Sequence, residues 1–184
     1  MDSALARRLQ TALAGRLTMP VSGRGDTTEI HVDVADVAEV MRILHDDPGL
    51  HFELLADLCG VDTGVAMEVV YHLWSSGTPD WLRVVAEGLS RDDPRAPSVT
   101  FLWKGAEWAE REAYDMFGIV FEGNRDLRRI YMPPDYLSFP LRKDFLLPDD
   151  SSRSPGEGVR AMEAMREPAG LVGTPAAVRR ARGA

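Results

Sequence analysis

Acidic side chains are concentrated in residues 107–117, where a pair of them could in principle act as general acid and general base. The segment contains Glu107, Glu110, Glu112 and Asp115. If it is helical, Glu110 and Glu112 point about 200° apart, because each residue turns the helix by about 100°. Catalysis on one substrate needs both groups at the same reacting atoms. A stand-alone hydrolase that depends on carboxylates is therefore only a distant alternative.

Glu110 has an unusual place in the same helical projection. Charged residues at spacings of four form one row, which consists of Glu107, Arg111 and Asp115. Apolar residues form the opposite face, which consists of Ala109, Ala113, Met116 and Phe117. Glu110 lies at the edge of that apolar face, where an unpaired charge costs several kcal/mol. We therefore predict that Glu110 is buried and bonded to backbone amides or to an arginine, with Arg128, Arg129 and Arg142 as candidates.

The histidines and the single cysteine are not spaced like metal or redox ligands. The four histidines are dispersed, at His31, His45, His51 and His72. Cys59 alone cannot supply an intramolecular disulfide, an all-cysteine zinc site or a self-contained iron–sulfur cluster. The glycines fit neither a phosphate-binding loop nor a dinucleotide fingerprint. We expect structural roles for these residues, with Cys59 a buried, inert thiol, and no cofactor or metal bound by this chain.

Basic and aromatic residues are mixed over residues 125–145. Acids are interspersed among them, at Asp126, Asp135 and Asp144, which is unlike a surface that stacks RNA bases. The net charge of −8 also removes the electrostatic argument for nucleic-acid binding. Arginine and tyrosine are typical of hot spots in protein–protein interfaces. We expect a protein partner and no nucleic acid.

Charge and composition divide the 184-residue chain near Asp150. Residues 1–150 carry a net charge of −11, whereas residues 151–184 carry +3, many prolines and glycines, and no aromatic residue. We predict one folded domain over residues 1–150 and an extended or disordered tail over residues 151–184. The sequence has no apolar stretch near the roughly 20 residues of a membrane-spanning helix. Membrane contact is therefore expected only through partners.

Hydrophobic periodicity predicts the elements that position these residues. Helices are predicted around the leucines of residues 5–17, over residues 37–44 after a capping box of Asp36 and Glu39, and over residues 106–117, ending at a left-handed Gly118. Strands are predicted over residues 29–34, 51–58, 67–74, 81–89 and 119–121, with a glycine-rich turn over 20–28 and irregular chain after Gly123. This order predicts an α+β fold with helices packed on one face of a mixed β-sheet, followed by the extended C-terminal tail.

Residues 110–145 resemble the signature of the thirty-kilodalton subunit family (the C subunit) of the proton-pumping NADH:quinone oxidoreductase, respiratory complex I. The matching residues are Glu-Arg-Glu-Ala-Tyr-Asp-Met-Phe-Gly-Ile at 110–119, then Phe121, Gly123, Asp-Leu-Arg-Arg-Ile at 126–130 and Pro-Leu-Arg-Lys-Asp-Phe at 140–145. Upstream segments at 55–62, 70–73, 82–84 and 97–100 follow the family's order, so the resemblance covers about residues 52–148. Asn124 departs from the pattern, because the family usually has histidine there.

The resemblance implies a cofactor-free subunit of the peripheral arm. It would support assembly and the large quinone-site subunit, its main partner, during electron transfer from NADH to quinone. FMN, iron–sulfur clusters, NADH and quinone would be bound elsewhere in the complex, and the chain would lie peripherally on the cytoplasmic side of the cell inner membrane. Related membrane-bound hydrogenases and other quinone- or ferredoxin-linked complexes use homologous subunits and are the alternative.

The resemblance assigns no residue a catalytic, cofactor-binding or metal-binding role. It marks sixteen residues as structural or partner-docking: Glu110, Arg111, Glu112, Tyr114, Asp115, Phe117, Gly118, Asp126, Leu127, Arg128, Arg129, Pro140, Leu141, Arg142, Lys143 and Asp144. Residues 128–136 and 140–145 are expected to form the docking surfaces. Charge reversals at Arg128 and Arg129 should then impair assembly more than folding.

Overall fold

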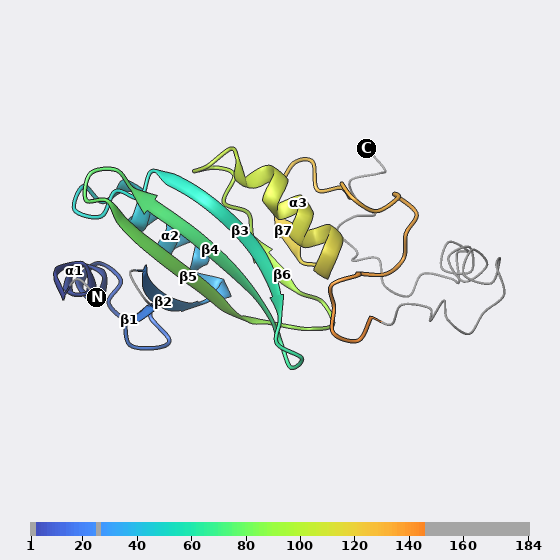
Figure 1. Cartoon of the computed structure of the whole chain (residues 1–184), viewed down its shortest axis with the longest axis horizontal. Helices are drawn as coiled ribbons and strands as arrows, with labels where there is room; N and C mark the ends of the chain where they lie inside the picture. The colour runs from blue at the N-terminus through green and yellow to red at the C-terminus, as the bar shows by residue number, and fades with distance from the viewer. Residues whose placement is uncertain (1–2, 25–26, 146–184) are drawn as a thin grey trace.

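A five-stranded mixed β-sheet organises the chain in the computed structural model, which describes residues 3–24 and 27–145 (Figure 1). The strands are β1 (Ser22–Arg24), β2 (Thr27–Asp33), β3 (Leu54–Asp62), β4 (Met67–Ser75) and β5 (Asp80–Leu89), in the order β1-β2-β5-β4-β3. β2 and β5 run parallel, and the other neighbours are antiparallel. A separate parallel pair joins β6 (Arg95–Pro97) to β7 (Val120–Glu122).

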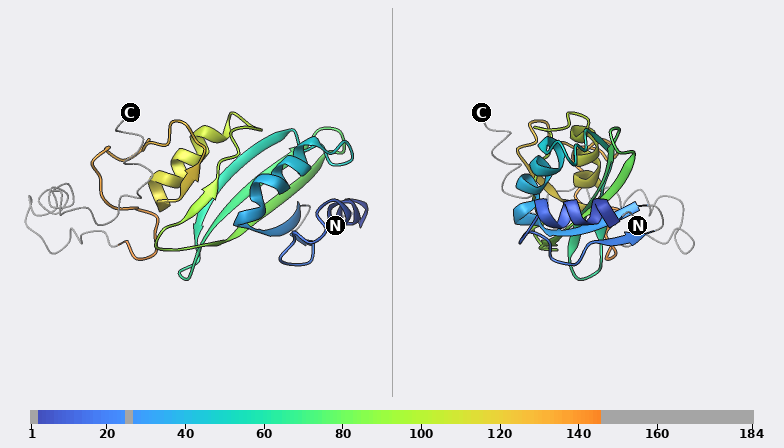
Figure 2. Two further views of the ribbon diagram at one scale, coloured as in Figure 1. Left: turned by 180° about the vertical axis from the view of Figure 1, so that it is seen from behind. Right: turned by 90° about the vertical axis from the view of Figure 1, so that its left-hand side faces the viewer.

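Three α-helices pack on one face of the sheet and share its core. They are α1 (Ser3–Ala12), α2 (Val37–Asp46), which follows the short 3₁₀ helix Val34–Asp36, and α3 (Ala106–Phe117). Figure 2 shows α2 lying across the sheet on the side turned away from the viewer in Figure 1. α3 packs mainly against β3, where Phe117 and Ile119 lie over Gly60. The predicted α+β fold, with helices on one face of a mixed sheet, is confirmed.

Alternating burial along the strands shows how the sequence builds this arrangement. Ile30 and Val32 of β2 are fully buried under the helices, and the alternating residues Glu29 and His31 are only half-buried. In α2 the buried residues are Val37, Val40, Met41 and Leu44, which recur at helical spacing. Apolar residues at these two periods place one face of each element in a common core.

Two predictions at element starts are wrong for identifiable reasons. Asp36 makes no capping hydrogen bond, because it is the last residue of the 3₁₀ helix; that helix is capped by Asp33, whose carboxylate accepts the amide of Ala35 at 2.9 Å. β3 begins at Leu54 instead of residue 51, because His51 has a left-handed backbone (φ 43°) that an extended strand cannot contain. The strands β1, inside the predicted turn, and β6, which contains Pro97, were not predicted.

The end of α3 follows the prediction residue by residue. The helix stops at Phe117, and Gly118 adopts the left-handed conformation (φ 79°) and donates its amide to the carbonyl of Tyr114 at 2.8 Å. The chain after Gly123 is irregular as far as residue 145. The predicted tail and its boundary at Asp150 lie outside the described residues, so this division stays a prediction. In the described part of the chain, no helix has both the length and the apolar character needed to cross a bilayer.

Candidate functional site on helix α3 and the segment after it

Asp115 anchors the irregular segment 123–145 to helix α3. This residue is fully buried, and its Oδ1 accepts from Nη1 of Arg129 at 2.6 Å. Its Oδ2 accepts from three successive amides, those of Ile130, Tyr131 and Met132, at 3.0, 2.7 and 2.9 Å. Burial alone would raise the pKa of Asp115, but these hydrogen bonds hold it below its ordinary value. One carboxylate thus fixes four consecutive residues of a segment that has no helix or strand of its own.

Arg129 is an internal residue. Its side chain is 8% exposed, and it donates to the carbonyls of Asp115 and Ser138, each at 3.0 Å. The guanidinium also lies over the rings of Tyr136 and Phe139. A charge reversal at Arg129 is therefore expected to impair folding itself. The expectation that reversals at Arg128 and Arg129 impair assembly more than folding then applies to Arg128 alone.

Arg111 supports the same segment from the next turn of the helix. It is 3% exposed and donates to the carbonyls of Arg128 and Arg129 at 3.1 and 3.4 Å. Its guanidinium also covers the ring of Trp108 and lies 3.8 Å from the carboxylate of Asp126. The charged row expected along α3 thus does not act as an exposed ladder, because Arg111 and Asp115 both turn to the segment that follows the helix.

Glu110 links α3 to the loop before it. The residue is fully buried, and its Oε1 accepts from the amide of Val99 at 2.8 Å. Its Oε2 accepts from the hydroxyl of Ser98 at 2.9 Å and from the side-chain Nδ2 of Asn124 at 2.8 Å. Burial raises the pKa of Glu110, although these hydrogen bonds oppose the shift.

The prediction for Glu110 is confirmed in part. Its burial and its bond to a backbone amide are as expected. The three candidate arginines are wrong, because each is held elsewhere: Arg129 by Asp115, Arg128 by Asp126, and Arg142 by the carbonyl of Phe117. Asn124, which departs from the resembled pattern, donates its side-chain amide to Glu110 instead.

Asp62 on β3 forms a second anchor that sequence reasoning missed. Its Oδ2 accepts from the backbone amide of Lys143 at 2.8 Å and from Arg91 at 2.9 Å. Arg91 also pairs with Asp144 at 3.0 Å. The hydrogen bond from Arg91, together with the amides of Gly64 and Lys143, holds the pKa of Asp62 well below its usual range. The only sequence signal for Asp62 was its place at the end of the matching segment 55–62.

The predicted site residues divide into an internal and an external group. The internal group has five buried members, which are Glu110, Arg111, Tyr114, Asp115 and Gly118. Its half-buried members are Phe117, Asp126, Leu127, Arg129, Pro140 and Arg142. The external group consists of Glu112, Arg128, Leu141, Lys143 and Asp144. Two large rings on α3 and the segment after it are also exposed, 63% for Trp108 and 64% for Tyr131. We call Trp108, Arg128 and Tyr131 the α3 surface.

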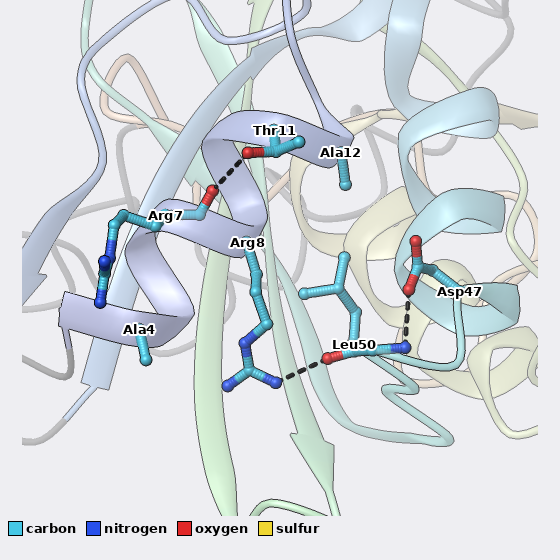
Figure 3. Close-up of a pocket in the computed structure, with 8 residues that line it drawn as sticks. Ala4, Arg7, Arg8, Thr11, Ala12, Asp47 and Leu50 are labelled. Atoms are coloured by element: carbon cyan, nitrogen blue, oxygen red, sulfur yellow. Dashed lines mark hydrogen bonds between the residues drawn. The ribbon is translucent and has the colours of Figure 1, made fainter.

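The buried charges of this region hold the surface in place by internal hydrogen bonds. Each buried carboxylate is engaged by internal donors, and Glu110 is buried whereas Glu112 is exposed, so the two do not face a common space. A cavity of about 510 Å³ lies at the other end of the molecule, between α1 and the turn after α2 (Figure 3). There Arg8 donates to the carbonyl of Gly49 at 2.7 Å. Among the described residues, no three His, Cys, Asp or Glu side chains group as metal ligands would.

Comparison with known proteins gives a consistent set of matches. Residues 30–151 match the family model described as respiratory-chain NADH dehydrogenase, 30 Kd subunit. The C subunit of the NADH-quinone oxidoreductase of Roseiflexus castenholzii is 45% identical over 140 residues, which cover 74% of this chain and 79% of that protein. The protein of the same name from Burkholderia mallei is 41% identical over 150 residues, which cover 77% and 74%.

A solved structure matches the fold as well. It is a chain of the membrane-bound sulfane sulfur reductase, an archaeal respiratory membrane complex, with a TM-score of 0.65 and 25% identity. The match covers 78% of this chain and 84% of that chain. All the predicted site residues, from Glu110 to Asp144, lie inside the span of the family model.

Proposed function

Because the chain belongs to the family of the respiratory-chain NADH dehydrogenase 30-kilodalton subunit, we propose that it works as the C subunit of a proton-pumping NADH:quinone oxidoreductase. The observation that carries this function is the 40–45% identity, over about three quarters of the chain, to proteins named as the C subunit of NADH-quinone oxidoreductase. The chain is thus a component of an oxidoreductase complex. Its proposed contribution is to the assembly of that complex.

In this role the chain presents a surface that is preorganised for binding its partner. Asp115 and Asp62 hold the irregular segment 123–145 at two points, so less conformational freedom is lost when a partner binds. The α3 surface offers tryptophan, arginine and tyrosine, the residue types that dominate interface hot spots. The occupant in this proposal is the large quinone-site subunit, with other peripheral-arm subunits nearby.

The proposal assigns the redox chemistry to other subunits. FMN, iron–sulfur clusters, NADH and quinone belong to the assembled complex, and this chain binds none of them. One cysteine cannot hold a cluster, which supports this division. The proposed location is peripheral, on the cytoplasmic side of the cell inner membrane, with membrane contact only through partners.

A related membrane-bound complex is the second candidate. The likeness to the sulfane sulfur reductase chain, at a TM-score of 0.65, favours a fold shared between such complexes. The identity to that chain is 25%, against 45% and 41% to the two NADH-quinone oxidoreductase relatives, so the first function has the stronger support.

Purification of the tagged chain from its native membrane tests the two candidates. Co-purification with subunits that carry flavin and oxidise NADH with quinone is expected. Co-purification with hydrogenase or sulfur-reductase subunits would favour the second candidate. The chain purified alone should be colourless and inactive with NADH. Stoichiometric flavin or iron, or NADH oxidation by the pure chain, would overturn the assembly role.

A further inference from the structure

The sheet face opposite the helices carries a cluster of charged side chains. On β2, Glu29 and His31 alternate with the core residues and so lie on this second face. On the neighbouring strand β5, Arg83 and Glu87 lie on the same face. The cluster is on a different face from the α3 surface and takes no part in the docking role proposed above.

His31 stands between two carboxylates. Its Nδ1 lies 2.6 Å from Oε1 of Glu87, and its Nε2 lies 3.1 Å from Oε1 of Glu29. A neutral imidazole has one N–H, so one of its nitrogens would direct a lone pair at a carboxylate oxygen. Only the doubly protonated imidazolium can donate to both. Burial alone would lower the pKa of His31, but the bonds to Glu87 and Glu29 raise it above the ordinary value.

The cluster joins three segments that are distant in sequence. Thr18, in the link of residues 13–21 between α1 and β1, donates its hydroxyl to Oε2 of Glu87 at 3.2 Å. The amide of Thr18 donates to the carbonyl of His31 at 2.9 Å. The backbone of His31 thus contacts the link directly. Its side chain contacts the link indirectly, because it bonds Glu87, which accepts from Thr18. The link is tied to both β2 and β5 at this point.

The remaining charged groups around His31 are mostly acidic. Arg83 of β5 donates to Glu29; burial alone would raise the pKa of Glu29, but this bond and that of His31 hold it below its ordinary value. Glu68 of β4 has its pKa raised by burial and by the nearby charge of Glu87. Asp33, next on this face of β2, accepts the amide of Ala35. Loss of the imidazolium charge would leave Arg83 as the cation among these acids.

We propose that His31 is a proton-dependent clasp that holds the link between α1 and β1 to the edge of β2, where the Thr18 hydroxyl reaches Glu87. With the proton bound, the imidazolium joins Glu29 to Glu87 and keeps Glu87 in reach of Thr18. Without it, a lone pair faces a carboxylate and the acids repel one another. The sign follows from linkage: the clasp is complete below the ordinary histidine value, about 6.5, and is lost as pH rises through the folded-state value of His31.

Histidine NMR on the full chain tests the protonation state directly. With labelled imidazole nitrogens, we expect both nitrogens of His31 to be protonated at pH 6 and its midpoint to lie above 6.5. Glu87→Gln should lower that midpoint. His72→Gln is the matched control, because His72 lies on the same face, and it should leave the His31 titration unchanged. A midpoint at or below 6.5, a single neutral tautomer already at pH 6, or no shift in Glu87→Gln would overturn the clasp.

Hydrogen exchange of the Thr18 amide tests the mechanical consequence. After correction for the intrinsic pH dependence of exchange, its protection should fall severalfold as His31 loses its proton, while the interior amide of Tyr71 keeps its protection. His31→Gln should remove this pH dependence. Glu87→Gln should move it to lower pH, together with the His31 midpoint, and so provides a test if His31→Gln does not fold. Constant protection of Thr18 across the His31 titration would overturn the proposal.

Discussion

The carboxylate of Asp115 and the guanidinium of Arg129 form an ion pair inside the protein, with 0% and 8% of their side chains exposed and 2.6 Å between Oδ1 and Nη1. The pair joins helix α3 to a segment that has no regular structure. The shape of the surface after α3 is therefore set by buried charges, and a substitution can damage the surface without touching an exposed residue.

Arg129→Ala should lower the free energy of unfolding by about 3–5 kcal/mol, because it leaves the Asp115 carboxylate buried without its cation. Urea denaturation of the full chain measures this. Arg128→Ala is the control, since its side chain is 70% exposed, and it should have little effect. Equal, small effects of the two substitutions would contradict an internal role for Arg129.

Glu110→Ala should lower the free energy of unfolding by about 1–3 kcal/mol, because it removes the acceptor for Ser98, Val99 and Asn124. Glu112→Ala removes an exposed carboxylate from the same helix and should be nearly neutral. The comparison by chemical denaturation separates loss of the hydrogen bonds from loss of charge on α3. A Glu110→Ala variant as stable as the wild type would show that these bonds contribute nothing.

Gly118→Ala should destabilise the chain by about 1–3 kcal/mol through strain and overpacking. The backbone there is left-handed, and an added Cβ would lie 2.7 Å from the ring of Phe139. Gly105→Ala at the other end of α3 is the matched control, because a Cβ there meets nothing within 4 Å and φ is −62°. Thermal unfolding should show a clear loss for the first variant and none for the second.

Acid should weaken the fold partly through Asp62. Its folded pKa is depressed by Arg91, so its contribution is present above the ordinary aspartate value, about 3.9, and is lost as pH falls toward the folded value. Asp62→Asn should therefore be less stable than the wild type at pH 7, and the difference should shrink below pH 4. Denaturant unfolding over this range measures the difference, and a difference independent of pH would contradict the assignment.

The local features of this fold could be predicted from sequence, and the long-range pairings could not. Helix α3 ends at Gly118 as predicted because periodicity and a C-terminal glycine are local signals, and the burial of Glu110 followed from its place on the helix. The partners Ser98 and Asn124 depend on how distant loops meet. Asp62 and Lys143 are 81 residues apart, so no spacing rule connects them.

Arg129 shows the same limit at a single residue. Within an irregular segment rich in arginine and aromatic rings, its sequence context is that of an interface residue, as for Arg128. The two differ because only Arg129 reaches the buried Asp115, and that geometry depends on the packing of the whole segment against α3.

Arg128→Glu and the pair Trp108→Ala, Tyr131→Ala should impair assembly without unfolding the free chain. All three side chains are largely exposed, so their removal costs little in folding, whereas arginine and large rings at an interface contribute most of its binding energy. Two measurements on each variant decide this: the yield of the tagged chain with its partner subunits from native membranes, and the denaturation midpoint of the chain alone.

Two controls separate docking from stability in that experiment. Trp81→Ala removes an exposed ring, 41% accessible, from strand β5, far in sequence from the α3 surface, and should leave assembly intact. Arg129→Glu should lower both readouts, since it breaks the buried pair before any partner is met. Full assembly of the Arg128→Glu and the double-alanine chains would show that the partner docks elsewhere, because their exposed side chains would then contribute no binding energy.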